Sequence, residues 1–369
     1  MINNNITIID EYRWRNNYAV LYQDEHGKYS LDANNLRCVI TLFSMCPSFP
    51  AFPLELFEEY TGIRRDIAAH TTHKSGRGII DSKKHPVIIE CKELEKSREG
   101  FIIEGERLVG RAIDDRLMLK SIIYTAKSPL EKNGYIERAD CPCYLSTEGI
   151  IASVTSSKPV PTEIAVCVMP QYSIDTVLRG EYTSLLITDC VNNPDNLGLV
   201  IRTADACGVD AVIVTGAGAA PYHKNCVRAS RGAIGRLPVL YYPDSEPVIA
   251  ELKSRGVMII GTDIAATTEI CDAVAPKKFA AVVGNETLGM SDKMRGNCDM
   301  MLKIDMPRGQ SSFNVAVAAG ITLHRLIDTV SLEKVDFDNL TEGEKTSVIQ
   351  AELEYSRGET IKHEDIDWS

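Results

Sequence analysis

Three polar segments of the chain contain the residue types that bind a ligand. They are NNPDNLGLVIRTADACG at residues 192–208, VVGNETLGMS at residues 282–291 and IDMPRGQSSFNVAVAAG at residues 304–320. Carboxylates and amides form hydrogen bonds with a ligand, arginine binds phosphate, and glycine lets a backbone approach a ligand closely. Each segment follows, or straddles, the end of an expected β-strand. Because ligands of open α/β sheets bind beyond the carboxyl ends of the strands, the segments predict one shared pocket.

Each segment alone also has a purely structural explanation. Asp195 or Asn196 can cap the helix that follows, Ser312 can cap the last apolar helix, and Gly289 can serve a tight turn. The recurrence of three such strand ends in one domain, in this order and spacing, favours the pocket.

The segments lie in the most regular region of the chain, residues 181–330. Its β-rich runs are SLLITDC, DAVIVTG, PVLYY, GVMIIGTD, FAAVVGN and MMLKIDM. They lack strict alternation of apolar and polar residues, which is typical of strands buried on both faces of a parallel sheet. The helical segments LGLVIRTADACG, EPVIAELKSRG and SFNVAVAAGITLHRLIDTV lie between or after them. This order predicts an α/β domain with a parallel sheet.

The rest of the chain divides into three parts. In residues 91–170, short strands such as FII and SIIYT alternate with the amphipathic helix GERLVGRAIDD, which predicts a smaller α/β domain. We interpret residues 1–90 as an N-terminal extension of mostly helical structure, without an assigned role. Residues 331–369 form an acidic C-terminal tail, and residues 170–180 are expected to link the two α/β domains.

The 369 residues have an ordinary globular composition, with 44% hydrophobic and 25% charged residues. No run approaches the ~20 apolar residues that a membrane-spanning helix needs, and the N-terminus lacks a basic-then-apolar secretory signal. We therefore expect a cytoplasmic protein without a membrane partner. The eleven cysteines are scattered, and Cys141 and Cys143 lack the two-residue spacer of zinc and redox motifs. Reduced thiols and no bound metal are expected.

The net charge of −11 argues at first against a nucleic-acid partner, but the charge is unevenly distributed. Residues 331–369 contain eleven Asp and Glu against four Lys and Arg, whereas residues 61–89 contain six Lys and Arg against two Asp. Local fields govern an encounter more than the total charge does. The charge therefore leaves a nucleic-acid partner open, although a solvated surface is the favoured explanation of the basic residues at 61–89.

A glycine-containing loop at residues 212–223, VIVTGAGAAPYH, raises a different function. Gly216 and Gly218 follow a strand as in a dinucleotide-binding loop, and Asp244 stands near the position of a ribose-binding acid. The third glycine of that motif is replaced by Pro221. A nucleotide-dependent oxidoreductase is therefore a minor alternative, beside a plain turn at the end of the strand.

Together, NNPDNLGLVIRTADACGVDAVIV, VVGNETLGMS and IDMPRGQSSFNVAVAAG resemble the three signature motifs of the SpoU (TrmH) family of RNA ribose 2′-O-methyltransferases, in the SPOUT class. The resemblance covers residues 183–329 and implies a knotted (trefoil) parallel-sheet domain that acts as a homodimer. Residues 97–169, through FIIEGERLVGRAI and IASVTSSKPVPTEIAV, are similar to the substrate-binding domain of many rRNA-directed members. The resemblance thus implies methylation of RNA, with rRNA favoured over tRNA.

The cofactor that the resemblance implies is S-adenosylmethionine (S-adenosyl-L-methionine), held largely by backbone groups of three loops. By position, its binding residues are Thr262, Gly284, Asn285, Gly289, Ile304, Met306 and Phe313. The third loop departs from the family pattern, because Asp305 precedes Met306, Pro307 follows it and Gly309 comes one place late. An RNA-binding module that has lost methyl transfer is therefore an alternative function.

The catalytic residues that the resemblance implies are Arg202, Asn196, Glu286, Ser312 and Asn314. A neutral ribose hydroxyl is a weak nucleophile, so a group must position it and accept its proton. Arg202 matches the arginine assigned that role in the family, but arginine is effectively always protonated in proteins, which favours a phosphate-binding role. In this fold the pocket forms at a dimer interface, where Arg202 can serve across subunits. Arg228, Arg231 and Arg236 form a candidate RNA-binding face, since phosphate contacts supply much of nucleic-acid affinity, and they are equally consistent with ordinary surface arginines.

Overall fold

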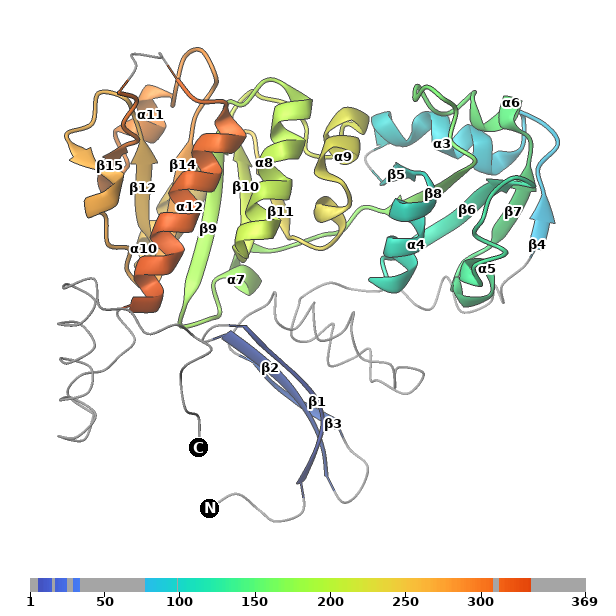
Figure 1. Cartoon of the computed structure of the whole chain (residues 1–369), viewed down its shortest axis with the longest axis horizontal. Helices are drawn as coiled ribbons and strands as arrows, with labels where there is room; N and C mark the ends of the chain where they lie inside the picture. Colours follow the sequence, from blue (N-terminus) through green and yellow to red (C-terminus); the bar gives the residue numbers. More distant parts are fainter. Residues whose placement is uncertain are drawn as a thin grey trace, which may run out of the picture.

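The computed structural model describes residues 6–14, 17–24, 29–33, 77–97, 99–307 and 312–332. These residues form three sheets, of seven, five and three strands (Figure 1). The strand orders are β11-β10-β9-β14-β12-β15-β13, β4-β7-β6-β8-β5 and β1-β2-β3. The candidate pocket belongs to the seven-stranded sheet.

Every strand pair in the seven-stranded sheet is parallel, which confirms the predicted fold class. Its strands are β9 (Thr183–Asp189), β10 (Ala211–Thr215), β11 (Val239–Tyr242), β12 (Met258–Thr262), β13 (Thr268–Glu269), β14 (Lys278–Val283) and β15 (Met300–Lys303). The helices are α7 (Ile174–Val177), α8 (Pro194–Cys207), α9 (Lys224–Ser230), α10 (Glu246–Ser254), α11 (Asp292–Arg295) and α12 (Val315–Leu332), with short 3-10 turns at Ala233–Gly235 and Ile270–Asp272. The trefoil knot stays an expectation from the resemblance.

Helices cover both faces of this sheet, which explains why its strands do not alternate. Leu186 in the middle of β9 packs in the core shared with α8 and α12. Its neighbours Leu185 and Ile187 pack in a second core with α10. Because successive side chains of a strand point to opposite faces, all three positions must be apolar.

Asn193 caps helix α8, which carries the first polar segment. Its side-chain oxygen accepts hydrogen bonds from the backbone N–H groups of Asp195 (2.8 Å) and Asn196 (3.3 Å). Pro194 stands in the first turn, and Gly208 ends the helix with a left-handed backbone (φ 81°). The cap is therefore neither Asp195 nor Asn196, and the side chain of Asn196 is available for other contacts.

The five-stranded sheet is mixed, with β8 antiparallel to β5 and β6, and β7 parallel to β6 and β4. Its strands are β4 (Arg77–Ile79), β5 (Gly100–Glu104), β6 (Leu119–Thr125), β7 (Cys143–Ser146) and β8 (Glu163–Val168). Its helices are α3 (Pro86–Ser97), α4 (Glu106–Asp114), α5 (Tyr135–Arg138) and α6 (Glu148–Ile151). Because β4 and α3 belong to this unit, it includes residues before the expected boundary at residue 91.

The N-terminal residues form strands where we expected mostly helix. Strands β1 (Ile6–Trp14), β2 (Asn17–Asp24) and β3 (Tyr29–Ala33) pair antiparallel. The helical expectation is therefore wrong for these residues, because β-branched and aromatic side chains favour an extended chain. The rest of the extension (34–76) and the acidic tail from residue 333 lie outside the described residues.

The two α/β domains pack against each other along a seam between α9 and β5 (Figure 1). The rings of Phe101 and Tyr222 meet across this seam at 5.1 Å between centroids. Arg236 pairs with Asp205 of its own domain and, at 3.8 Å, with Asp115 of the five-stranded domain. Burial raises the pKa of Asp115 to about 6, although neighbouring Arg111 opposes that shift. Within the described residues, no helix is both long and apolar enough to cross a bilayer.

Candidate functional site

A pocket of about 460 Å³ lies at the carboxyl ends of β12, β14 and β15. All seven residues predicted to bind a cofactor line it: Thr262, Gly284, Asn285, Gly289, Ile304, Met306 and Phe313. Of the predicted catalytic residues, Glu286 and Ser312 line it as well. Gly309, which is out of place in the third motif, lies outside the described residues. The second and third polar segments thus share one pocket.

The loop after β14 is a tight hairpin that only glycine permits. The backbones of Asn285 and Gly289 exchange two hydrogen bonds, of 2.8 and 2.9 Å, and Gly289 has a left-handed backbone (φ 72°). A Cβ atom on Gly284 would lie 2.3 Å from both the carbonyl carbon of Gly289 and the nitrogen of Met290. Since these neighbours are backbone atoms, any side chain at residue 284 would force the hairpin apart.

The side chain of Asn285 stabilises the loop through hydrogen bonds to backbone groups. Its oxygen accepts hydrogen bonds from the N–H groups of Thr287 (2.9 Å) and Leu288 (3.0 Å). Its amide nitrogen donates to the carbonyl of Cys190 at 2.9 Å. Cys190 has an unusual left-handed backbone (φ 57°) at this contact. The side chain of Asn285 therefore shapes the pocket wall.

A chain of amide contacts joins all three polar segments. The amide nitrogen of Asn196 donates to a carboxylate oxygen of Glu286 at 2.7 Å. The amide nitrogen of Asn314 donates to the side-chain oxygen of Asn196 at 3.2 Å. Asn314 also caps α12, because its own oxygen accepts a hydrogen bond from the N–H of Ala316 at 2.9 Å. The predicted convergence of the segments is therefore present, with Asn196 at the centre of the chain of contacts and Glu286 at one end. Asn196 and Asn314 do not line the pocket themselves but are joined by hydrogen bonds to Glu286, which does.

Arg202 is the predicted catalytic residue that lies apart from both the pocket and these contacts. It is exposed on α8, six residues after Asn196, and helical geometry rotates it by about 240° from Asn196. It lines a different cavity, together with Arg107, Arg228 and Arg231. Within one chain, Arg202 therefore joins the predicted RNA-binding arginines.

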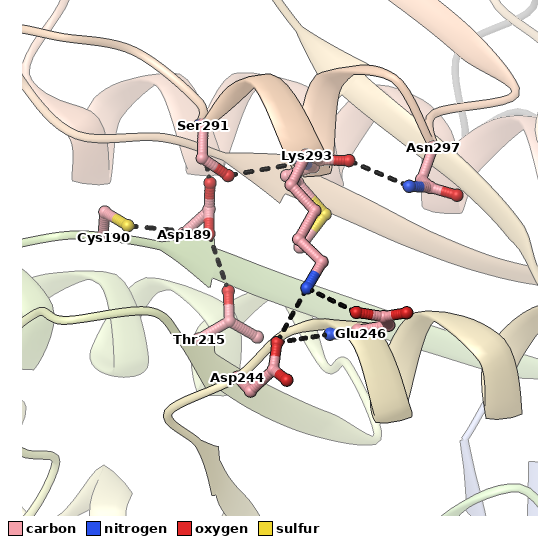
Figure 2. Close-up of polar contacts among 9 residues, drawn as sticks. Asp189, Cys190, Thr215, Asp244, Glu246, Ser291, Lys293 and Asn297 are labelled. Carbon is pink, nitrogen blue, oxygen red and sulfur yellow. Dashed lines mark hydrogen bonds and ion pairs between the residues drawn. The ribbon is translucent and has the colours of Figure 1, made fainter.

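Asp189, at the end of β9, is a positioning residue that our sequence reasoning missed (Figure 2). It is 1% exposed, and one carboxylate oxygen accepts the hydroxyl of Thr215 at 2.9 Å. The other accepts the backbone N–H of Ser291, at the end of the second polar segment, at 2.7 Å. An aspartate closing the apolar run SLLIT was the available signal, because a buried carboxylate requires donors.

We expect Asp189→Ala to lower the free energy of unfolding by on the order of 3 kcal/mol, because two buried donors lose their acceptor. Urea denaturation measures this difference. Asp189→Asn keeps one amide oxygen as an acceptor and is expected to cost less. An Asp189→Ala protein as stable as the wild type would contradict the bonding scheme.

The glycine-containing loop at 212–223 has a structural use. A Cβ atom on Gly216 would lie 2.4 Å from the sulfur of Cys190, and one on Gly218 would lie 2.5 Å from the carbonyl oxygen of Val191. The carboxylate of Asp244 accepts the N–H of Glu246 (3.1 Å) and pairs with Lys293 at 2.9 Å (Figure 2). These residues therefore serve packing and helix capping, and none of them lines the pocket.

The fold and the pocket define the class of the protein: a parallel α/β domain with a ligand site beyond its strand ends. A family model described as "SpoU rRNA Methylase family" matches residues 184–324. Among curated relatives, the 23S rRNA (guanosine(2553)-2'-O)-methyltransferase RlmP of Bacillus subtilis is 29% identical over 252 residues, covering 67% of this chain and 98% of the relative. The 23S rRNA (guanosine-2'-O-)-methyltransferase RlmB of Vibrio vulnificus is 31% identical over 238 residues, covering 64% and 90%.

Among solved structures, the SpoU methyltransferase AviRb of Streptomyces viridochromogenes, in complex with AdoMet, has a TM-score of 0.61 at 23% identity. The match covers 69% of this chain and 99% of that chain, and it supports the fold. The chain belongs to the SpoU rRNA methylase family.

Proposed function

We propose that this protein transfers the methyl group of S-adenosylmethionine to a ribose 2′-hydroxyl of ribosomal RNA. The observation that carries this proposal is that the second and third polar segments line one pocket, while Asn196 of the first segment is hydrogen-bonded to Glu286 and Asn314 beside it. The similar RlmP and RlmB proteins are named for 23S rRNA, and AviRb was crystallised with AdoMet, which supports both substrates. Action on rRNA would also place the protein in the cytoplasm, where ribosomes are assembled.

The residues of the pocket fit the cofactor. Gly284 lets the hairpin close tightly at the pocket wall, and Ile304, Met306 and Phe313 offer apolar surface for an adenine. A volume of about 460 Å³ lies in the usual range of small-ligand sites. When bound, S-adenosylmethionine supplies an electrophilic methyl group.

The polar residues around the pocket are proposed to orient the ribose. Glu286 accepts a hydrogen bond from Asn196, which leaves its second oxygen available to a ribose hydroxyl. Ser312 stands on the same wall of the pocket. Arg202 carries a permanent positive charge, and we propose that it binds the phosphate beside the target ribose and stabilises charge that develops on the 2′-oxygen.

We further propose that the working protein is a homodimer. Arg202 lies outside the pocket of its own chain, so a site containing both needs a second copy. Leu199 on α8 and Val317 on α12 are 39% and 48% exposed, and these two helices pack together. Exposed apolar side chains on adjacent helices favour a self-association surface, and a two-fold axis would bring Arg202 of one subunit toward the pocket of the other.

Methyl transfer is tested by incubating the full chain with methyl-labelled S-adenosylmethionine and unmodified 23S rRNA made by transcription. We expect label in RNA at one ribose, which is located by alkaline hydrolysis because a 2′-O-methyl group blocks cleavage there. RNA binding without label would favour the alternative of a binding module. Binding of NAD without binding of S-adenosylmethionine would refute the cofactor.

A further inference from the structure

Four arginines from both α/β domains surround one cavity at the seam between the domains. They are Arg107 on α4, Arg202 on α8, Arg228 on α9 and Arg231 directly after α9, and all four are exposed. The cavity has a volume of about 490 Å³. Figure 1 shows α9 on the side of the seven-stranded domain that faces the five-stranded domain. We name these four residues the arginine cluster.

The arginine cluster has little negative charge to balance it. Among the described residues, Asp195 is the one acid that lines the cavity, and it lies 3.2 Å from Arg228. No ion pair within the described part of the chain involves Arg107, Arg202 or Arg231. Like charges held around one cavity repel each other, and a bound polyanion removes that repulsion. The cluster is therefore suited to consecutive phosphates.

A second cavity, of about 500 Å³, continues the seam beyond the arginine cluster. The two cavities share Leu108 and Arg228 among their lining residues. One wall comes from β5 and residues 153–157, and the other comes from Tyr222 and the start of α9. The volume is within the range of sites that hold a nucleoside-sized ligand.

The second cavity combines aromatic surface with polar groups. Phe101 and Tyr222 form part of its wall, and Glu104 accepts hydrogen bonds from the hydroxyls of Thr155 and Ser157. The hydroxyl of Tyr222 is buried and has no hydrogen-bond partner among the described residues. Such a group usually has a water or a ligand as its partner. Aromatic walls with hydrogen-bonding groups are what an unstacked RNA base requires.

We propose that the seam is a groove for a single-stranded part of the substrate RNA. The arginine cluster binds consecutive phosphates, and the second cavity receives one base of the same strand. The planar guanidinium group matches a phosphate with two hydrogen bonds, and base recognition in RNA targets unpaired nucleotides. That the bound strand is RNA depends on the proposed function, whereas the groove is inferred from the two cavities alone. Arg107 makes the five-stranded domain a direct part of the phosphate site.

The phosphate site is tested with Arg107→Gln in the full chain. The probe is a fluorescent single-stranded RNA of about 15 nucleotides, the length that such grooves cover. We expect the Kd to rise about tenfold and the slope of log K against log salt to fall by about 1, as for one lost phosphate contact. Lys132→Gln is the matched control, because it removes one exposed charge of the same domain away from both cavities. Unchanged affinity and salt slope in Arg107→Gln would overturn the phosphate site.

The base site is tested with Tyr222→Phe, which removes only the unpartnered hydroxyl. We expect the Kd for single-stranded RNA to rise about fivefold, as for one lost hydrogen bond, while the free energy of unfolding stays the same or increases. The same RNA as a duplex should bind more weakly than the single strand to the wild type. Loss of stability with unchanged RNA affinity would show a structural role and overturn the base site.

These outcomes separate the groove from the proposed function. Wild-type methylation of RNA together with unchanged Kd in both variants would overturn the groove alone. Weaker RNA binding by both variants, in a wild type that transfers no methyl group, would support the groove and refute the proposed function.

Discussion

Arg202→Ala is expected to lower kcat for methyl transfer to RNA by roughly 10²–10³-fold, the loss seen when one preorganised charge-stabilising donor is removed. The affinity for S-adenosylmethionine should stay near the wild-type value, because Arg202 does not line the pocket of its own chain. Single-turnover methylation at saturating RNA measures the first quantity, and calorimetric titration measures the second. An Arg202→Ala protein with full activity would refute the role that we assign to it.

Mixed dimers show which pocket Arg202 serves. If Arg202 acts on the pocket of the other subunit, a dimer of one Arg202→Ala and one Glu286→Gln chain contains one intact site and one doubly altered site. Random exchange of the two inactive variants should then restore about a quarter of the wild-type activity, since half of the dimers are mixed. No recovery in fully exchanged mixtures would mean that Arg202 and Glu286 act from the same chain.

Gly284→Ala is expected to weaken S-adenosylmethionine binding by about 100-fold, equivalent to about 2.7 kcal/mol. The added Cβ atom would lie 2.3 Å from two backbone atoms of the hairpin, at Gly289 and Met290. Neither neighbour has a flexible end that could move aside, so the hairpin must open, and the pocket wall that it forms shifts with it. Calorimetric titration of the cofactor measures the loss.

Gly149→Ala is the matched control for this substitution. Gly149 lies in α6, and a Cβ atom there would meet nothing within 4 Å. We expect normal cofactor affinity and, because alanine favours a helix, unchanged or slightly higher stability. Thermal unfolding of both variants separates a local change at the hairpin from general unfolding. Wild-type cofactor affinity in Gly284→Ala would show that the hairpin does not form the cofactor site.

Much of the catalytic-domain fold could be predicted, because local patterns carry it. The six apolar runs from SLLITDC to MMLKIDM became β9, β10, β11, β12, β14 and β15. Helix α9 (Lys224–Ser230) was missed, because it is short and glycines follow it, so that no helical spacing of apolar residues can be recognised there. The N-terminal strands β1, β2 and β3 were not predicted either, although their β-branched and aromatic residues favour an extended chain.

Part of the candidate site could also be predicted. Glycines and polar residues at strand ends predicted one pocket, and the family resemblance implied Thr262, Gly284, Glu286 and Ser312, which meet in it. Asp189 was missed although it stands at such an end. It is buried, and its carboxylate accepts hydrogen bonds from the backbone N–H of Ser291 and the hydroxyl of Thr215. Sequence patterns indicate which polar groups are exposed, whereas the role of a buried carboxylate becomes clear only from the hydrogen-bond donors that surround it in the structure.

The amino-acid sequence by itself determined the parallel sheet, the polar strand ends and the family, because apolar runs and glycine spacing are local properties. Only the tertiary structure decided which side chains meet. Asn196 reaches Glu286 across 90 residues and Asn314 across 118, while Arg202, on the same helix, points to the seam between the domains. The physical reason is that the rotation of a helix and the docking of two domains depend on packing far along the chain, which no local period encodes.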